Sequence, residues 1–195
     1  PHQETASVRR QAQHPIRKAK IAILPTKSSM SAIADPDDIA SITINLKIIE
    51  GKELVAKDRS LLGKRTTSDP YVEVFMGDKN YGHKTKVIEK TCDPKWNESF
   101  KIMVTGDHAR DILRHEHPFR LVIWDKDMAI DDCMGVVDIV VDDLKMEEPE
   151  WVAVENGTPD VRPEGQRIHF CKNATGELLL QYSIKCKTMK EAYGQ

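Results

Sequence analysis

Residues 41–49 read SITINLKII, and the alternation in this stretch decides the fold class. Apolar residues take every second position and polar residues fill the positions between them: Ile42, Ile44, Leu46 and Ile48 against Thr43, Asn45 and Lys47. A period of two places the two sets on opposite faces of an extended chain. The stretch therefore predicts a β-strand with one face in a core and the other toward solvent.

Strand-like runs recur along the rest of the chain, with turn-forming residues between them. We expect further strands at 71–76, 83–89, 99–104, 119–124, 135–141, 151–154 and 176–184. Only the segments 108–115 and 142–148 look helical, and both are short. About eight strands, few helices and one core predict an all-β fold, an eight-stranded antiparallel β-sandwich.

The chain divides into a tail, one domain and a short end. Residues 1–40 show no sustained periodicity and carry more basic than acidic residues, so we expect an extended basic tail or linker. We assign residues 41–186 to the domain and 187–195 to a short C-terminal tail. The N-terminal tail either packs on its own domain or docks into a partner in a larger assembly, and both interpretations stay open.

The cysteines, the apolar runs and the absence of catalytic motifs limit the classes of protein to which this sequence can belong. Cys92, Cys133, Cys171 and Cys186 show no paired spacing, so we expect reduced thiols in the cytoplasm or another reducing compartment. No apolar run approaches the ~20 residues of a membrane-spanning helix. No histidine joins a serine or cysteine in a nucleophile motif, and no glycine-rich phosphate loop occurs. We therefore predict no enzymatic activity, and we expect no nucleic-acid partner.

Two predicted loops are rich in aspartate. The stretch WDKDMAIDD (124–132) carries Asp125, Asp127 and Asp132, and the loop after the first strand carries Asp58 and Asp69. The loops of a sandwich cluster at its two ends, so loops that share an end would bring these carboxylates together. Crowded carboxylates repel one another, and two calcium ions with shared oxygen ligands would satisfy them. The alternative is a pair of solvated, aspartate-rich turns.

Four motifs together resemble the C2 domain, the calcium- and phospholipid-binding sandwich of protein kinase C and extended synaptotagmins. They are SDPYVEVF (68–75), KTKVIEKTCDPKWNESF (84–100), WDKD (124–127) and DDCMG (131–135). The resemblance covers roughly residues 41–186. It implies calcium ligands at Asp58, Asp69, Asp125, Asp127 and Asp132. The C-terminal position of the strand at 176–184 resembles the circularly permuted topology shared with phospholipases C.

The sequence departs from the family pattern in three places. The stretch RSLLGKRTT lengthens the first loop between Asp58 and Asp69. The loop within WDKDMAIDD (124–132), which we call the third loop, is one residue shorter than in synaptotagmin, so Asp131 is an alternative ligand to Asp132. Residues 155–175 form an insertion before the last strand, and we assign it no role.

Apolar and basic residues accompany the aspartates at the two loop tips. The apolar residues are Met128 and Ile130 in one loop and Leu61 and Leu62 in the other. The basic residues are Lys64, Arg65 and Lys126. Exposed apolar side chains on neighbouring loops fit insertion among lipid headgroups, and the cations would meet anionic phosphates. The alternative is that the apolar side chains pack back onto the domain.

A second basic site is expected at HKTKVIEK (83–90). Lys84 and Lys86 would project from the same face of one strand. The resemblance implies that they contact phosphoinositide headgroups. Glu73 and Phe75 stand where protein kinase C carries lysines, so a solvated basic edge is the alternative.

These features predict a calcium-dependent, peripheral membrane module that targets anionic phospholipid membranes. Residues 41–195 carry a net charge of −4, and two calcium ions would reverse the local repulsion between the acidic loops and an anionic bilayer. One alternative is a scaffold subunit docked in a large membrane-associated assembly through its N-terminal tail. Another is a regulatory fragment of a lipid-signalling enzyme.

Overall fold

The structure is a computed structural model, and it describes residues 35–59, 63, 65–76, 79–114, 116, 119–139, 146–157 and 171–194. Its helices are the 3-10 helix η2 (Pro36–Asp38), α1 (Gly106–Leu113) and α2 (Met189–Tyr193). Its strands are β1 (Ile39–Lys52), β2 (Asp58–Arg59), β3 (Arg65–Thr67), β4 (Pro70–Met76), β5 (Lys79–Lys84), β6 (Lys95–Thr105), β7 (Phe119–Asp125), β8 (Asp132–Ile139), β9 (Met146–Ala153) and β10 (Glu177–Thr188). The predicted N-terminal tail lies almost wholly outside the described residues, and the predicted C-terminal tail begins inside β10 and includes α2.

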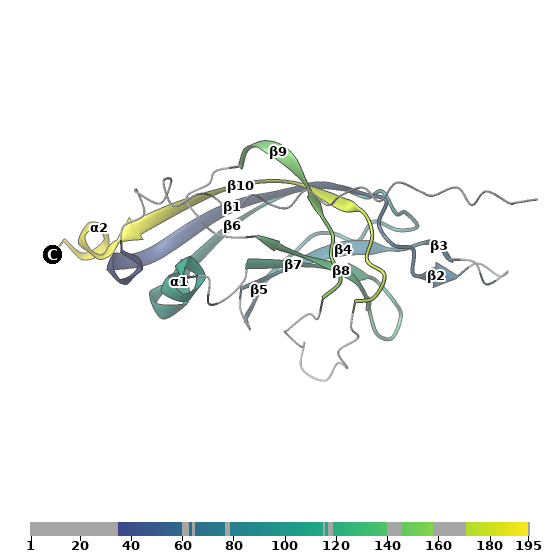
Figure 1. The fold of residues 1–195 in the computed structure, drawn as a ribbon, viewed down its shortest axis with the longest axis horizontal. Coiled ribbons are helices and arrows are strands. Elements are labelled where there is room, and N and C mark those ends of the chain that lie inside the picture. The colour runs from purple at the N-terminus through teal and green to yellow at the C-terminus, as the bar shows by residue number, and fades with distance from the viewer. Residues whose placement is uncertain are drawn as a thin grey trace, which may run out of the picture. The chain divides into compact units, whose positions relative to one another are not determined.

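Two antiparallel sheets of four strands each form the sandwich, and they lie one above the other in Figure 1. One sheet has the order β6-β1-β10-β9 and the other the order β5-β4-β7-β8, with β2 and β3 forming a separate small pair. The predicted all-β, eight-stranded antiparallel sandwich is therefore confirmed. The last strand, β10, lies between β1 and β9; the permuted topology stays a prediction.

The core lies between the two sheets, and the first strand supplies it as its alternation predicts. Ile42, Ile44, Leu46 and Ile48 are at most 1% exposed, and they face inward side chains of β4 and β7 such as Val72, Val74, Leu121 and Ile123. Each such side chain contributes roughly 1.5–3 kcal/mol when it leaves water. This burial fixes the register of β1, because a slip by one residue would expose its whole apolar set.

The two ends of the sandwich differ. The helix expected at 108–115 is present as α1, which buries Ala109, Ile112 and Leu113 at helical spacing. In Figure 1, α1 and α2 lie at the end where β1 begins, and β2 and β3 lie at the end where β1 finishes. The aspartate-rich loops follow β1 and β7, so they belong to the end that carries β2 and β3.

Two predicted elements differ from the structure. The predicted helix at 142–148 is wrong for residues 146–148, which begin β9 and pair with β10, while 142–145 lie outside the described residues. The predicted strand at 83–89 is wrong beyond Lys84, where β5 ends. The Thr85 hydroxyl accepts a hydrogen bond from Val72 N–H (2.9 Å) and so takes the place of a ladder carbonyl. Lys84 and Lys86 therefore do not share one strand.

A second apolar layer covers the outer face of the β4-β7-β8 strands. It consists of Tyr71, Phe75, Val122, Trp124, Cys133, Val136 and Cys171. The two ends of the predicted insertion complete this layer, because Glu155 bridges to Val136 and Gly157 bridges to Cys171. The insertion to which the sequence assigned no role therefore covers one sheet with its two ends.

A disulfide joins this layer to the sandwich. Cys133 in β8 and Cys171 are bonded, with their Cα atoms 5.0 Å apart. The expectation of four reduced thiols is wrong for this pair and holds only for Cys92 and Cys186. The two bonded cysteines are 38 residues apart and form no recognisable sequence motif. They meet because the insertion folds back over β8. Both cysteines are buried, which shields the bond from soluble reductants.

Gly176, at the entry to β10, is expected to be intolerant of substitution. Its φ is +88°, and a Cβ built there would lie 2.2 Å from the Lys52 carbonyl oxygen. We expect Gly176→Ala to lower the free energy of unfolding by about 3 kcal/mol, measured by urea denaturation. Gly194→Ala is the matched control, because Gly194 has a φ of +70° with nothing within 4 Å, and its cost should be about 1 kcal/mol. Equal losses would contradict the close backbone approach.

Candidate metal centre and lipid-facing loops

Strand pairing brings the predicted ligands to one end of the sandwich. Asp125 ends β7 and lies opposite Asp132, the first residue of β8. Asp125 also lies opposite Pro70 in β4, so Asp69 stands directly beside it. Asp58 begins β2 and pairs with Thr67, two residues before Asp69. The two aspartate-rich loops therefore meet although they are far apart in the sequence.

Backbone hydrogen bonds fasten the two loops together. Asp69 N–H donates to Asp125 Oδ1 (2.5 Å) across 56 residues of chain, and Lys126 N–H donates to the Asp69 carbonyl (3.0 Å). Lys90 N–H donates to Asp69 Oδ1 (2.6 Å). Thr67 Oγ1 lies 3.4 Å from Asp58 Oδ2 and donates to it weakly. The carboxylates of Asp69 and Asp125 are thus held by backbone N–H groups, and that of Asp58 is held by a side-chain hydroxyl.

Asp125 is the most constrained of these carboxylates. It is 1% exposed, and its Oδ2 is buried with no hydrogen-bond partner among the described residues. Burial raises the pKa of Asp125 to about 6, and the nearby charges of Asp58 and Asp127 act in the same direction. The hydrogen bonds from Asp69 N–H and Ser68 oppose this shift. An unpartnered buried carboxylate oxygen is costly unless a cation or a proton reaches it.

The other aspartates add to the same negative field. Burial raises the pKa of Asp127, and the charges of Asp132, Asp58, Asp131 and Asp69 raise it further. Carboxylates that lie close together disfavour one another's charge, and a bound cation would relieve this repulsion. All of the donors are oxygen atoms, which suits a hard cation such as calcium.

Asp131, the alternative ligand, is already engaged by protein groups. Its carboxylate accepts hydrogen bonds from Tyr71 Oη (2.8 Å), Lys126 Nζ (3.1 Å) and Asp127 N–H (3.0 Å). Burial acts to raise the pKa of Asp131, but these hydrogen bonds outweigh it and lower the pKa. Asp132 lies directly across from Asp125 in the pairing of β7 with β8.

The described part of the chain contains no preformed metal-binding site. No group of three or more His, Cys, Asp or Glu side chains there stands in a coordinating arrangement. The carboxylates Asp69, Asp125 and Asp131 instead accept hydrogen bonds from backbone N–H groups. To coordinate an ion, the aspartate side chains would have to reorient so that their oxygens point toward it, while the backbone of the two loops stays in place.

The predicted insertion residues are partly described. Met128 is fully exposed at 106% and does not pack back onto the domain, whereas Ile130 is 41% exposed and packs back in part. Leu61, Leu62, Lys64 and the side chain of Arg65 lie outside the described residues. Lys126 is exposed, and its ammonium group is bound to Asp131.

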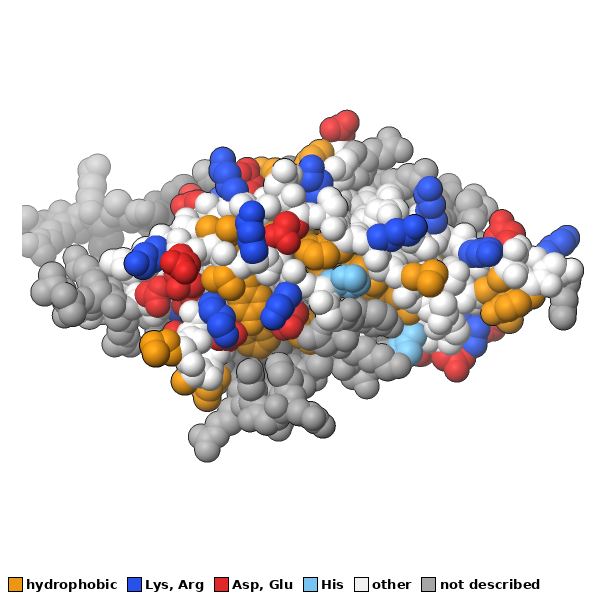
Figure 2. Space-filling view, turned by 180° about the vertical axis from the view of Figure 1, so that it is seen from behind, with side chains coloured by type: hydrophobic (Ala, Val, Ile, Leu, Met, Phe, Trp, Pro, Cys, Tyr) orange, Lys and Arg blue, Asp and Glu red, His pale blue; other side chains and the backbone are white. Residues whose placement is uncertain are grey.

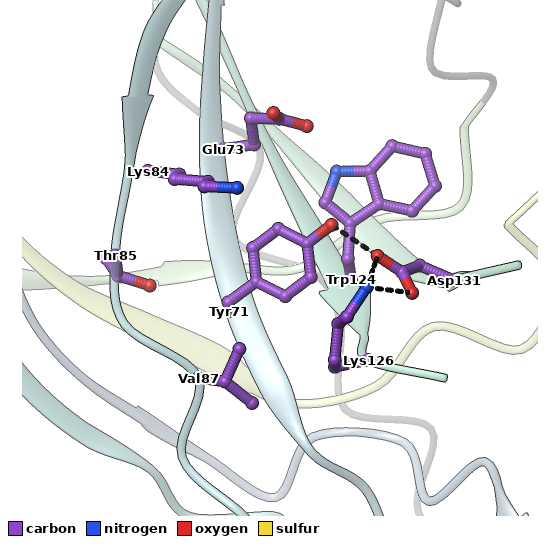
Figure 3. A pocket seen from close by; sticks show the side chains of 8 residues that line it. All are labelled: Tyr71, Glu73, Lys84, Thr85, Val87, Trp124, Lys126 and Asp131. Carbon is purple, nitrogen blue, oxygen red and sulfur yellow. Dashed lines mark hydrogen bonds and ion pairs between the residues drawn. The ribbon is translucent and has the colours of Figure 1, made fainter. Parts of the chain in front are cut away.

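A pocket of about 320 Å³ opens beside the third loop (Figure 3). It is lined by Tyr71, Glu73, Lys84, Thr85, Val87, Trp124, Lys126 and Asp131. In Figure 3, the hydroxyl of Tyr71 and the ammonium of Lys126 converge on Asp131. Lys84 is among the lining residues, whereas Lys86 is not, and the latter's backbone N–H donates to Glu98 (3.0 Å).

Tyr71 and Trp124 also belong to this site, although neither was predicted from the sequence. Trp124 Nε1 is a buried donor with no partner in the described part of the chain. Burial, with the hydrogen bond and charge of Asp131, raises the pKa of Tyr71, so its hydroxyl stays a donor. The available signal was their position, because each aromatic residue lies within two positions of a predicted ligand: Tyr71 of Asp69 and Trp124 of Asp125.

The fold and the site together define a two-sheet sandwich whose acidic loops gather at one end. The family model of the C2 domain matches residues 42–154, more than half of the chain. The chain therefore belongs to the C2 domain family.

Curated relatives agree with the family. Mouse (Mus musculus) extended synaptotagmin-1 is 31% identical over 93 residues, which are 47% of this chain and 8% of the relative. The GTPase activating protein 1 of rice (Oryza sativa subsp. indica) is 34% identical over 92 residues, which are 47% of this chain and 46% of the relative. The matched region thus spans less than half the length of these proteins.

Solved structures show the same fold. The calcium-bound pair of C2 domains of extended synaptotagmin 2 superposes with a TM-score of 0.52 at 21% identity, covering 77% of this chain and 47% of that one. A single C2 domain of a plant extended synaptotagmin 1 superposes with a TM-score of 0.51 at 18% identity, covering 77% of this chain and 98% of that one. At this level of identity the likeness concerns the fold alone.

Proposed function

We propose that this chain is a calcium-dependent module that binds anionic phospholipid membranes as a peripheral protein. The observation that carries the proposal is Asp125, a buried carboxylate with an unpartnered oxygen, fastened to Asp69 and set among other aspartates. Membership of the C2 family supports membrane binding, and the calcium dependence rests on these residues. Among the described residues, no helix is long and apolar enough to cross a bilayer.

Calcium would be held by the predicted set, which is Asp58, Asp69, Asp125, Asp127 and Asp132. We propose Asp132 rather than Asp131, because Asp131 already accepts three hydrogen-bonding groups. Five carboxylates supply ten oxygens, so two calcium ions, which take six to eight ligands each, would share bridging carboxylates and fill their remaining positions with water or lipid oxygens. The bound ions would supply positive charge where the loops otherwise repel one another and an anionic surface.

The switch would be electrostatic. Residues 41–195 carry a net charge of −4, and two ions would cancel it at the end that faces the membrane. Met128 and Ile130 would then enter the headgroup layer, together with Leu61 and Leu62 of the first loop. Each Lys or Arg close to an anionic surface adds about 1 kcal/mol, and the candidates are Lys64, Arg65, Lys126, Lys84 and Lys86.

The pocket beside the third loop suits a phosphate-bearing headgroup. Lys84 supplies positive charge, whereas the ammonium of Lys126 is already bound to Asp131 in the same pocket; Trp124 Nε1–H is a buried donor without an acceptor among the described residues. Glu73 lines the same pocket and opposes a highly charged phosphoinositide. We therefore propose that phosphatidylserine-type headgroups are favoured over phosphoinositides.

Vesicle co-sedimentation tests the proposal directly. Wild-type protein should pellet with phosphatidylserine-containing vesicles in saturating calcium and much less in chelator, and neutral phosphatidylcholine vesicles should show no such difference. Equal pelleting in calcium and in chelator would rule out a calcium switch.

Asp127→Asn tests the metal site apart from any membrane. We expect calorimetric titration to give a calcium dissociation constant raised by about tenfold or more, because about 1.4 kcal/mol corresponds to a factor of ten. Asp107→Asn is the matched control, since Asp107 lies on α1 at the other end and the substitution changes the net charge equally. An unchanged affinity in Asp127→Asn would remove this residue from the ligand set.

A further inference from the structure

The outer face of the β6-β1-β10 strands is a basic grid. Cross-strand pairing sets its rows: Met103–Thr43–Lys185, Lys101–Asn45–Ser183, Ser99–Lys47–Gln181 and Thr105–Ser41–Lys187. Directly paired residues point to the same side of a sheet, and the intervening isoleucines and leucine of β1 point into the core. No aspartate or glutamate belongs to these rows. We call this surface the basic face.

The lysines of the basic face form no salt bridge within the described ranges, although the charge of Lys187 acts on Glu191 of α2. Lys101, Lys185 and Lys187 are exposed, and Lys47 lies on the same face. The same sheet pairs its charges near the calcium end, where Lys52 binds Glu177 (2.7 Å) and Lys95 lies 3.5 Å from Glu50. Each row of the basic face holds one lysine, so the four positive charges are spread over three strands and no two of them are directly paired.

An apolar side chain lies among these lysines. Met103 is 66% exposed in a row with Lys185, with Lys101 two residues away on the same strand. A basic surface with a protruding apolar side chain matches the interface of an anionic bilayer, which takes the cations at its headgroups and the apolar group below them. Figure 2 shows Lys and Arg side chains spread over the length of one face of the molecule, with Asp and Glu side chains beside several of them toward the left of that view.

We propose that the basic face is a second contact surface for an anionic phospholipid bilayer and that it acts without calcium. The lysines of adjacent rows lie about 7–12 Å apart, from the spacing of strands and residues in a sheet. Such spread charges on an open sheet face suit many mobile headgroups, whereas one acidic segment would be held best by a groove. About nine residues of β1, roughly 30 Å, separate Thr43 from the calcium end. Each contact can therefore be removed without touching the other.

Charge reversal on the basic face tests the proposal in chelator, where the calcium loops contribute nothing. The probe is a vesicle of phosphatidylserine and phosphatidylcholine at low ionic strength. Each lysine near an anionic surface is worth about fivefold in partitioning, so Lys101→Glu/Lys185→Glu should bind at least about 25-fold more weakly than wild type. Met103→Ser should lose roughly threefold, because one partly buried apolar side chain is removed from the contact. The further gain on adding calcium should remain in both variants.

The control separates this face from net charge. Lys95→Glu/Lys172→Glu makes the same change in charge at exposed positions outside the basic face, and its calcium-free binding should fall by less than a factor of about three. Equal losses in the two double variants would overturn the proposal, as would unchanged binding of Lys101→Glu/Lys185→Glu with an unaltered thermal unfolding curve. Binding to poly-glutamate but not to anionic vesicles would assign the face to an acidic polypeptide and would also overturn it. Calcium titration of Asp127→Asn decides the calcium switch separately.

Discussion

Asp125→Asn should make the calcium-free protein more stable at neutral pH while it abolishes calcium binding. The pKa of Asp125 is about 6 in the folded chain and 3.8 for an ordinary aspartate, so folding favours its protonated form. The ionised carboxylate therefore destabilises the folded state. This destabilisation is absent below pH 3.8, grows between pH 3.8 and 6, and is constant above pH 6. A shift of this size corresponds to about 2–3 kcal/mol. Asparagine removes the charge and keeps an oxygen that can accept from Asp69 N–H.

Urea denaturation in chelator measures this effect. At pH 7.5 the variant should be more stable than wild type by about 2 kcal/mol, and the difference should shrink toward zero near pH 4. Asp107→Asn, at the other end of the sandwich, should show no comparable gain, since Asp107 is exposed and bound to Arg110. A variant that is less stable than wild type at pH 7.5 would contradict the burial of an uncompensated charge at Asp125.

The same substitution should weaken calcium binding by about 100-fold or more. Removing one charged partner from a buried ionic site costs about 3 kcal/mol or more, and each 1.4 kcal/mol is a factor of ten. Calorimetry should therefore show no heat of binding at concentrations that saturate wild type, and calcium should no longer stabilise the variant against urea. Retained affinity would mean that the unpartnered oxygen of Asp125 does not face the ion.

Met128→Ser/Ile130→Ser should lose most of the calcium-dependent membrane affinity. Both side chains are exposed at the tip of the third loop, and their joint transfer into a headgroup layer is worth about 3 kcal/mol, or about 100-fold in partitioning. Vesicle co-sedimentation in saturating calcium measures the loss. Calcium affinity without lipid should stay the same, because neither side chain supplies an oxygen ligand.

Met189→Ser is the matched control for this variant. Met189 is 43% exposed on α2, at the end of the sandwich away from the calcium loops. Its replacement removes a similar apolar group from solvent-facing surface and should leave calcium-dependent binding within about a factor of two. If both variants bound vesicles as wild type does, the loop tip would not enter the bilayer.

The sequence predicts those parts of the fold and site that depend on short-range pattern. The alternation in residues 41–49 predicted β1 and its buried face, and the strand at 119–124 placed Asp125 at its end. The closeness of Asp69 to Asp125 was predictable from the general arrangement of sandwich loops. Their direct hydrogen bond depends on the pairing of β4 with β7, which no local pattern encodes.

Features that need long-range pairing could not be read from the sequence. The basic face exists because β10 pairs with β1, although the two strands are more than a hundred residues apart in the sequence. Met103, Thr43 and Lys185 share a row only because both β6 and β10 pair with β1. The proposed preference for Asp132 over Asp131 rests in part on the hydrogen bond from Tyr71 to Asp131, and Tyr71 belongs to a strand distant in sequence. The residues after Lys84 left the strand pattern because a single threonine hydroxyl replaced a backbone acceptor.

The bond between Cys133 and Cys171 also governs what a cut in the intervening chain would do. The stretch 158–170 lies inside the covalent ring that this bond closes, so one hydrolysed peptide bond there leaves the two pieces joined. The carboxy-terminal piece contains β10, which holds a central place between β1 and β9. A nicked molecule therefore keeps that strand tethered until a reductant opens the ring, and its two fragments separate only under denaturing, reducing conditions.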